Sequence, residues 1–153
     1  MLRYHNTLHT KALMNGTNIC LSICTRCRDG REHIYETRGG ARLAEKFMKY
    51  VDKHTSLALR GVQCMSQCKR PCVVSFTGSE HFTYSFGDLD PECPSVVRAL
   101  QEFAELFQNA PEGFVLRSDR PKVLRAGILG RYPPIKTNSD LVLNLAEKYS
   151  DEG

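Results

Sequence analysis

The order in which apolar residues change their spacing along the chain limits its fold more than any other feature. Asn18–Cys24 alternates apolar with small or polar residues, a pattern typical of a strand, and Leu57–Cys64 is a second such segment. Between them, the apolar residues of Ala41–Val51 recur every three or four positions, which indicates an amphipathic helix. Because a helical crossover joins parallel strands, these two strands should be parallel in one sheet.

The next segment adds a hairpin and a second helix. Cys72–Phe76 and His81–Phe86 have strand character and flank a turn at 77–80, so they should pair antiparallel. The second helix is predicted to begin at Asp90–Pro91 and to bury one apolar stripe. The residues of that stripe are Val96, Leu100, Phe103 and Phe107. This order predicts an α/β (α+β) fold of the thioredoxin-like type, with a mixed four-stranded sheet, two helices and a C-terminal extension.

The chain has 153 residues, enough for one domain with extensions. Residues 1–16 are polar and basic without a clear period, which predicts a flexible basic tail. Residues 17–116 are predicted to form the thioredoxin-like metal- or cluster-binding domain. Residues 117–153 are predicted to be a basic C-terminal extension with a short helix from Ser139 to about Tyr149.

The cysteines are unusual in number and in placement. There are seven, which is odd, they are clustered, and the N-terminus lacks the apolar core of a secretory signal. A disulfide scaffold would show the opposite features, so metal ligands or redox groups are the better interpretation. No apolar run approaches the roughly 20 residues that cross a bilayer. We therefore expect a cytoplasmic protein that does not contact membranes.

Four of the cysteines fall where two loops should meet. Cys24 ends the first predicted strand and Cys27 lies just beyond it, while Cys64 ends the second strand and Cys68 follows in the next loop. Parallel neighbouring strands end at the same edge of a sheet, so the two loops should lie together there. Four thiolates are the ligands that a [2Fe–2S] cluster needs, and the nearby cations suit its negative charge. These cations are Arg26, Arg28, Arg31, Lys69 and Arg70.

The other three cysteines receive separate predictions. Cys20 lies on the first strand roughly 13 Å from Cys24, too far to share a small cluster, so it should be a core residue. Cys72 is predicted to begin the third strand and is an alternative ligand. Cys93 precedes Pro94 at a helix start and is expected to have a structural role.

Several motifs carry a resemblance to known proteins. The segment Cys64–Pro71, followed by a hairpin strand, resembles the second ligand motif of thioredoxin-like [2Fe–2S] ferredoxins. Over roughly residues 18–135 the chain also resembles a bacterial family of predicted metal-binding proteins of unknown function. The motifs in question are Cys24–Arg28, Cys64–Cys72, Tyr84–Leu89, Arg120–Pro121 and Arg131–Pro134. The resemblance implies a thioredoxin-like fold and a bound metal centre but no reaction, and the spacing from Cys24 to Cys27 is shorter than in typical ferredoxins of this kind.

Together these patterns favour a [2Fe–2S] ferredoxin-like protein that transfers single electrons and is not an enzyme. The alternative is a zinc-binding or metal-handling protein, a carrier or sensor, because the same cysteines could ligate zinc. Thiol–disulfide exchange by Cys24 and Cys27 is disfavoured, since a reactive C-x2-C normally opens a helix and the predicted helix begins about a dozen residues later. The pair Gly39–Gly40 is interpreted as the start of that helix rather than a phosphate-binding loop.

The net charge of +4 is distributed unevenly. Between residues 117 and 136, six cations face a single acid, Asp119, which favours docking of an acidic redox partner. The cations are Arg117, Arg120, Lys122, Arg125, Arg131 and Lys136. Aromatic residues do not interleave with them as a base-stacking surface requires, so no nucleic-acid partner is expected. A homodimer is left open.

Overall fold

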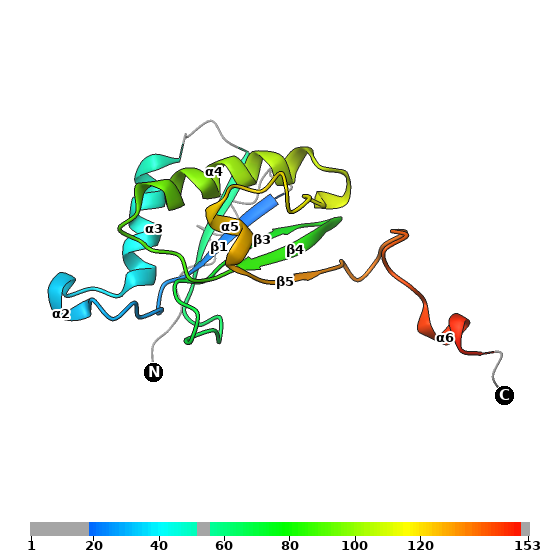
Figure 1. Ribbon diagram of the computed structural model, residues 1–153, viewed down its shortest axis with the longest axis horizontal. Helices are drawn as coiled ribbons and strands as arrows, with labels where there is room; N and C mark the ends of the chain where they lie inside the picture. The colour runs from blue at the N-terminus through cyan, green and yellow to red at the C-terminus, as the bar shows by residue number, and fades with distance from the viewer. Residues whose placement is uncertain (1–18, 52–55, 151–153) are drawn as a thin grey trace, which may run out of the picture.

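The computed structural model describes residues 19–51 and 56–150, so the predicted tail at 1–16 lies outside the described residues. The described part contains a five-stranded sheet in the order β2-β1-β3-β4-β5 (Figure 1). Its strands are β1 Ile19–Cys24, β2 Leu57–Val62, β3 Val74–Gly78, β4 His81–Phe86 and β5 Ile128–Tyr132.

The predicted crossover and hairpin are both present. β1 and β2 are parallel, with Cys24 opposite Val62, and the connection between them contains α2 Glu32–Tyr35 and α3 Gly39–Tyr50. β3 runs antiparallel to β1, and the hairpin pairs β4 antiparallel to β3. A parallel crossover followed by an antiparallel hairpin and a helix is the thioredoxin-like arrangement, so the predicted fold class is confirmed.

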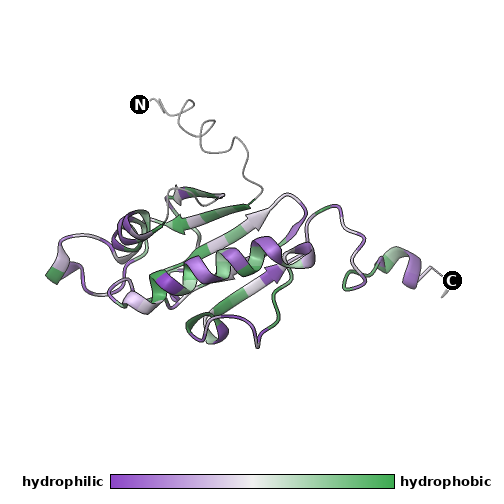
Figure 2. Ribbon diagram, turned by 90° about the horizontal axis from the view of Figure 1, so that it is seen from above, coloured by the Kyte–Doolittle hydropathy of each residue, from purple (hydrophilic) through white to green (hydrophobic). Residues whose placement is uncertain are grey.

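The core lies between the sheet and α4 Pro94–Asn109, which contacts α3. The ring of Phe103 lies 4.8 Å from the ring centroid of Phe76, 5.2 Å from that of Tyr84 and 5.0 Å from that of Phe86. Figure 2 shows polar and apolar residues on different sides of α4, as an amphipathic helix requires. All four residues of the predicted stripe are buried: Val96, Leu100, Phe103 and Phe107.

The prediction of four strands is wrong by one. β5 pairs antiparallel with β4 and places Arg131 opposite Tyr84. The sequence hides this strand because it is an edge strand, half-buried or exposed along its whole length, and so shows no clear apolar alternation. The preceding turn of helix, α5 Val123–Ala126, buries Leu124 in the core. The domain therefore continues to Tyr132, beyond the boundary predicted at residue 116.

Other element boundaries also differ from the predictions. β2 ends at Val62 and β3 begins at Val74, so Cys64 and Cys72 both lie in the connection rather than on strands. In the predicted C-terminal helix only α6 Leu145–Lys148 is helical, capped by the side chain of Asn144. This segment extends away from the sheet (Figure 1). In the part of the chain that the structure describes, no helix is long and apolar enough to cross a membrane.

Candidate metal centre

Backbone hydrogen bonds join the ends of β1, β2 and the segment that enters β3. The backbone N–H of Thr25 donates to the carbonyl of Val62 (2.8 Å), and that of Cys24 donates to the carbonyl of Val73 (2.9 Å). The loop that follows β1 is therefore fixed beside both ends of the connection from β2 to β3. That connection carries Cys64, Cys68 and Cys72, so the two cysteine-bearing segments meet at one edge of the sheet, as parallel pairing requires.

Cys24 and Cys27 form a buried thiol pair. Each residue is only 4% exposed. The pKa of Cys27 is raised to about 11, chiefly by burial; a hydrogen bond from the Val73 backbone opposes the shift, and the adjacent Cys24 thiol adds to it. Two sulfurs that interact this directly can reach one metal ion or one iron of a cluster.

Cys72 is a third buried thiol near this pair. It is fully buried, and its pKa is raised to about 12, first by burial and then by the proximity of Cys27 and Asp29. Its backbone N–H donates to the carbonyl of Leu89 at 3.3 Å, which anchors it just before β3. The predicted alternative ligand is therefore buried next to Val73, the residue whose carbonyl binds the backbone N–H of Cys24.

Cys64 and Cys68 lie on the surface. The pKa of Cys64 is lowered, first by hydrogen bonds from the backbone and hydroxyl of Ser66, and to a smaller extent by the charge of Arg26. Cys68 is close enough for its charge to raise the pKa of Cys27. Both side chains are exposed, unlike those of the thiol pair.

The predicted ligands are therefore brought together only in part. Within residues 19–51 and 56–150, no three side chains of Cys, His, Asp or Glu converge on a point that could hold a metal ion. The donor types nevertheless suit a thiolate-bound metal, since Cys24 and Cys27 are both buried at the end of β1 and the other candidate thiols lie on the neighbouring segment. Assembly of a four-thiolate site requires the exposed 64–68 loop to move toward the buried pair.

Gly40 fixes the thiol pair against α3, a role that the sequence did not reveal. Its backbone N–H donates to the carbonyl of Cys27 at 3.1 Å. A Cβ at this position would lie 1.9 Å from the carbonyl oxygen of Cys24 and 3.2 Å from the Cβ of Cys27. Only glycine allows this close approach, so Gly40 does more than start the predicted helix.

A charge network holds the loop after Cys27. Asp29 and Arg42, each with a side chain 8% exposed, form an ion pair of 2.5 Å. The Nε of Arg42 also binds Glu92 at 2.8 Å, and Arg31 joins Asp29 to Asp90. Burial alone would raise the pKa of Asp29, but hydrogen bonds from Arg42 and Arg31 lower it overall. These residues are far apart in sequence, so no local pattern could predict the network.

The remaining cysteines agree with their predictions in position. Cys20 lies in β1 and is buried at 7% exposure, as expected for a core residue. The Sγ of Cys93, at the start of α4, lies 3.0 Å from the hydroxyl of Ser95. Two of the predicted loop cations already have acidic partners, because Arg70 pairs with Asp88 at 2.6 Å and Arg31 joins the network above.

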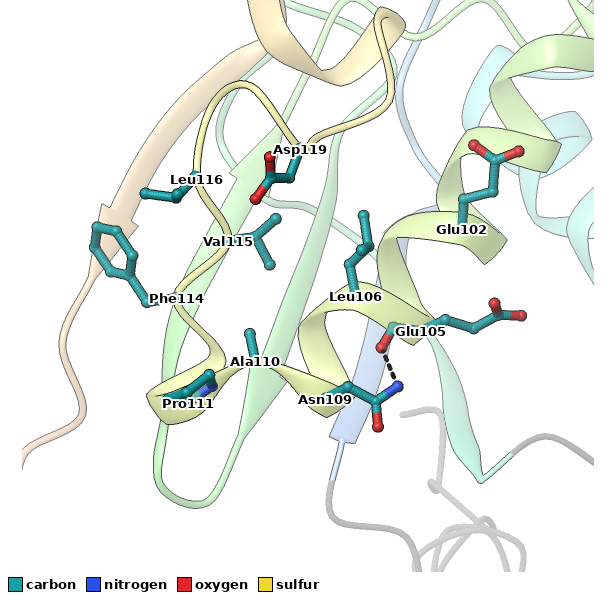
Figure 3. A pocket seen from close by; sticks show the side chains of 10 residues that line it. All are labelled: Glu102, Glu105, Leu106, Asn109, Ala110, Pro111, Phe114, Val115, Leu116 and Asp119. Carbon is teal, nitrogen blue, oxygen red and sulfur yellow. Dashed lines mark hydrogen bonds between the residues drawn. The ribbon is translucent and has the colours of Figure 1, made fainter.

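A separate cavity of about 700 Å³ lies between the C-terminal half of α4 and the segment that follows it (Figure 3). Apolar side chains such as Leu106 and Phe114 line it together with three carboxylates, Glu102, Glu105 and Asp119. Its lining contains no cysteine or histidine, so this cavity is not the metal centre.

Comparisons with known proteins give a family but no assigned activity. No curated protein matches the chain. A solved structure of a thioredoxin-like [2Fe–2S] ferredoxin from Aquifex aeolicus is 16% identical, with a TM-score of 0.47, over 79% of this chain and 99% of that one. That likeness is too weak to bear on function. A family model matches residues 21–134, most of the chain. The chain therefore belongs to the family described as "Protein of unknown function (DUF1636)".

Proposed function

We propose that this protein binds a [2Fe–2S] cluster and transfers single electrons to and from a partner protein. The observation that carries the proposal is the burial of Cys24 and Cys27, each 4% exposed, at the end of β1 beside a segment with three further cysteines. Cys64 and Cys68 would supply the other two thiolates, with Cys72 as the alternative. When bound, such a cluster supplies one-electron redox chemistry at an anionic centre.

The protein's own residues support this site in two ways. Gly40 and the Asp29–Arg42 pair fix the loop that carries Cys24 and Cys27, so half of the ligand set is preorganised. The exposed 64–68 loop supplies cysteines near the surface, where an electron can reach a partner. We propose an electron carrier rather than an enzyme.

Zinc binding is the second candidate, and the position of Cys72 favours it. Cys72 is fully buried on the segment that adjoins Cys24 and Cys27, so three buried thiols lie in one region, to which Cys68 could add a fourth. Four thiolates in a compact set suit tetrahedral zinc. The protein would then be a structural zinc protein, a metal carrier or a metal sensor.

One preparation distinguishes the two candidates. The protein is purified without oxygen, and its visible absorption, iron, zinc and acid-labile sulfide are measured. About two irons and two sulfides per chain with visible absorption bands support the cluster. A colourless protein with one zinc and no sulfide supports the second candidate and ends the electron-transfer proposal.

The proposal extends to location and partner. We propose a cytoplasmic location because a reducing cytoplasm keeps such thiols available for metal.

The basic segment 117–136 is the proposed docking surface for an acidic partner, and only its exposed cations are available for docking. Arg120 is buried, and Arg125 donates to the carbonyls of Arg120 and Ser118. The exposed cations are Arg117, Lys122, Arg131 and Lys136. Replacing these four by glutamine should weaken partner binding and flatten its salt dependence; unchanged binding and salt dependence would reject the surface.

A further inference from the structure

Two arginines are buried in the described part of the molecule, and they differ in whether their guanidinium groups have hydrogen-bond partners. Arg42 is 7% exposed and binds Glu92, Asp29 and the carbonyl of Thr37. Arg120 is 5% exposed, yet its Nε and Nη1 atoms are fully buried without a hydrogen-bond partner. A buried cation is costly unless a counter-charge or hydrogen-bond acceptor meets it, so Arg120 lacks a group that Arg42 has.

The neighbours of Arg120 increase this deficit of negative charge. Its guanidinium lies 5.9 Å from the ring centroid of Tyr84, and the guanidinium of Arg131 lies 5.8 Å from the same ring. Burial lowers the pKa of Arg120; Tyr84 opposes this, and the charges of Arg131 and Arg117 lower the pKa further. The face of one aromatic ring attracts cations but does not accept the planar hydrogen bonds of two guanidinium groups.

Arg131 and Arg117, the two arginines near Arg120, are exposed to solvent. The register of β4 and β5 places Arg131 opposite Tyr84, and its guanidinium lies 3.8 Å from the ring centroid of Phe114. Stacking on Phe114 orients the planar group while the residue remains exposed. Arg117 is exposed as well. Two surface cations thus lie beside one buried cation.

The described residues do not supply the missing anion. Within residues 19–51 and 56–150, which the structure describes, no carboxylate lies within ion-pair distance of Arg117, Arg120 or Arg131. Asp119, the nearest in sequence, accepts a hydrogen bond from the Ser118 hydroxyl at 2.9 Å. The three arginines therefore concentrate positive charge without an acidic side chain among the described residues to neutralise it.

We propose that Arg120, Arg131 and Arg117 form a binding site for a small oxyanion, a carboxylate or a phosphate. The two surface arginines attract the anion, and a side-chain movement that uncovers the buried Nε and Nη1 of Arg120 lets their N–H groups donate to its oxygens. Guanidinium groups match the planar oxygen pairs of both anions, which explains why three arginines and no lysine form the cluster. The hydrogen bonds of Arg125 to the carbonyls of Arg120 and Ser118 fix the backbone that presents Arg120.

The test uses the full chain as purified, with its metal content unchanged. Sodium phosphate and sodium acetate are titrated separately, with sodium chloride keeping the ionic strength constant, and binding is followed by calorimetry and by the thermal unfolding midpoint. We expect saturable binding of one anion per chain and a rise in the midpoint. Saturation by phosphate alone identifies a phosphate site, and saturation by acetate identifies a carboxylate site.

Single substitutions distinguish a specific anion site from nonspecific attraction to the positive charge of the protein. Arg131→Gln should lower the affinity for the anion about tenfold, because one charge-assisted hydrogen bond is lost. Lys148→Gln removes the same charge from the exposed helix α6, away from the three arginines, and should leave the affinity for the anion unchanged. Arg120→Met should abolish binding; if that variant does not fold, Arg117→Gln and Arg131→Gln decide the question. If neither anion shows saturable binding, or if Lys148→Gln loses as much affinity as Arg131→Gln, the proposal is overturned.

Discussion

Cys24 and Cys27 are each 4% exposed and are fixed from three sides, whereas Cys64 and Cys68 lie on the surface of the neighbouring loop. Hydrogen bonds from Thr25 to β2 and from Gly40 to Cys27 hold the first loop, and the Asp29–Arg42 pair anchors its continuation. The second loop has fewer such contacts. In the proposed metal centre, folding would therefore build the half that carries Cys24 and Cys27, and metal binding would complete the half that carries Cys64 and Cys68.

The largest expected effect is that of Gly40→Ala. The new Cβ would lie 1.9 Å from the carbonyl oxygen of Cys24, and backbone cannot yield as a flexible side chain can. We expect a loss of about 3 kcal/mol in the free energy of unfolding, measured by urea denaturation. Gly61→Ala is the matched control, because its Cβ would meet only the Cγ2 of Thr25 at 2.9 Å. Equal losses in both variants would show that the first loop is not held more tightly than its surroundings.

The charge network should have the next largest effect. Asp29→Ala leaves Glu92 as the acidic partner of Arg42 and removes the anchor of the loop after Cys27. We expect a loss of about 2 kcal/mol, less than for a fully broken buried pair because Glu92 remains. Glu45→Ala, which removes the exposed pair with Lys49, should leave stability nearly unchanged. A loss in Asp29→Ala no larger than in this control would mean that the network does not hold the loop.

Cysteine substitutions in the two loops should have similar effects on metal content but different effects on the stability of the metal-free protein. Cys27→Ser should abolish metal binding and destabilise the metal-free protein by about 1 kcal/mol, because a hydroxyl replaces a buried thiol. Cys68→Ser should lower metal content, and abolish it once Cys72 is replaced as well, yet by itself leave the stability of the metal-free protein almost unchanged. Metal content is measured by elemental analysis and stability by urea denaturation.

Controls for these substitutions come from the cysteines outside the site. Cys93→Ser should retain full metal content. Because Cys72 could replace a missing ligand, Cys64→Ser and Cys68→Ser are also combined with Cys72→Ser. Full metal content in the combined variants would show that the second loop supplies no ligand.

The smallest effect is the pH dependence of the network. The carboxyl pKa values of Asp29 and Glu92 are lowered in the folded protein, the first despite its burial and the second chiefly by Lys46. Both carboxylates therefore stabilise the fold above their unfolded pKa values, near 4, and this contribution is lost as the pH falls through the folded values. Urea denaturation between pH 6 and roughly 3 should show a weaker decline in Asp29→Asn than in the unmodified chain. Parallel declines would exclude Asp29 as a source of this dependence.

The sequence predicted most of the fold because its central elements have strong periodic patterns. The alternation of Asn18–Cys24 and the helical stripe on Val96, Leu100, Phe103 and Phe107 depend only on which side chains are buried. β5 was missed since an edge strand needs no apolar alternation, and its partner β4 lies about forty residues earlier in the chain. The buried Arg120 looked like one more surface cation for the same reason: local sequence does not show what packs against it.

By itself, the sequence determined which donors are available and on which segments they lie. The spacing of Cys24, Cys27, Cys64, Cys68 and Cys72, together with a parallel crossover, is enough to bring two cysteine-bearing segments to one edge of a sheet. Only the tertiary structure decided which thiols are buried, that Gly40 and Arg42 hold their loop, and that Arg120 is buried without a counter-charge. The physical reason is that burial and ion pairing depend on residues distant in sequence, whereas strand and helix periodicity is written into each segment separately.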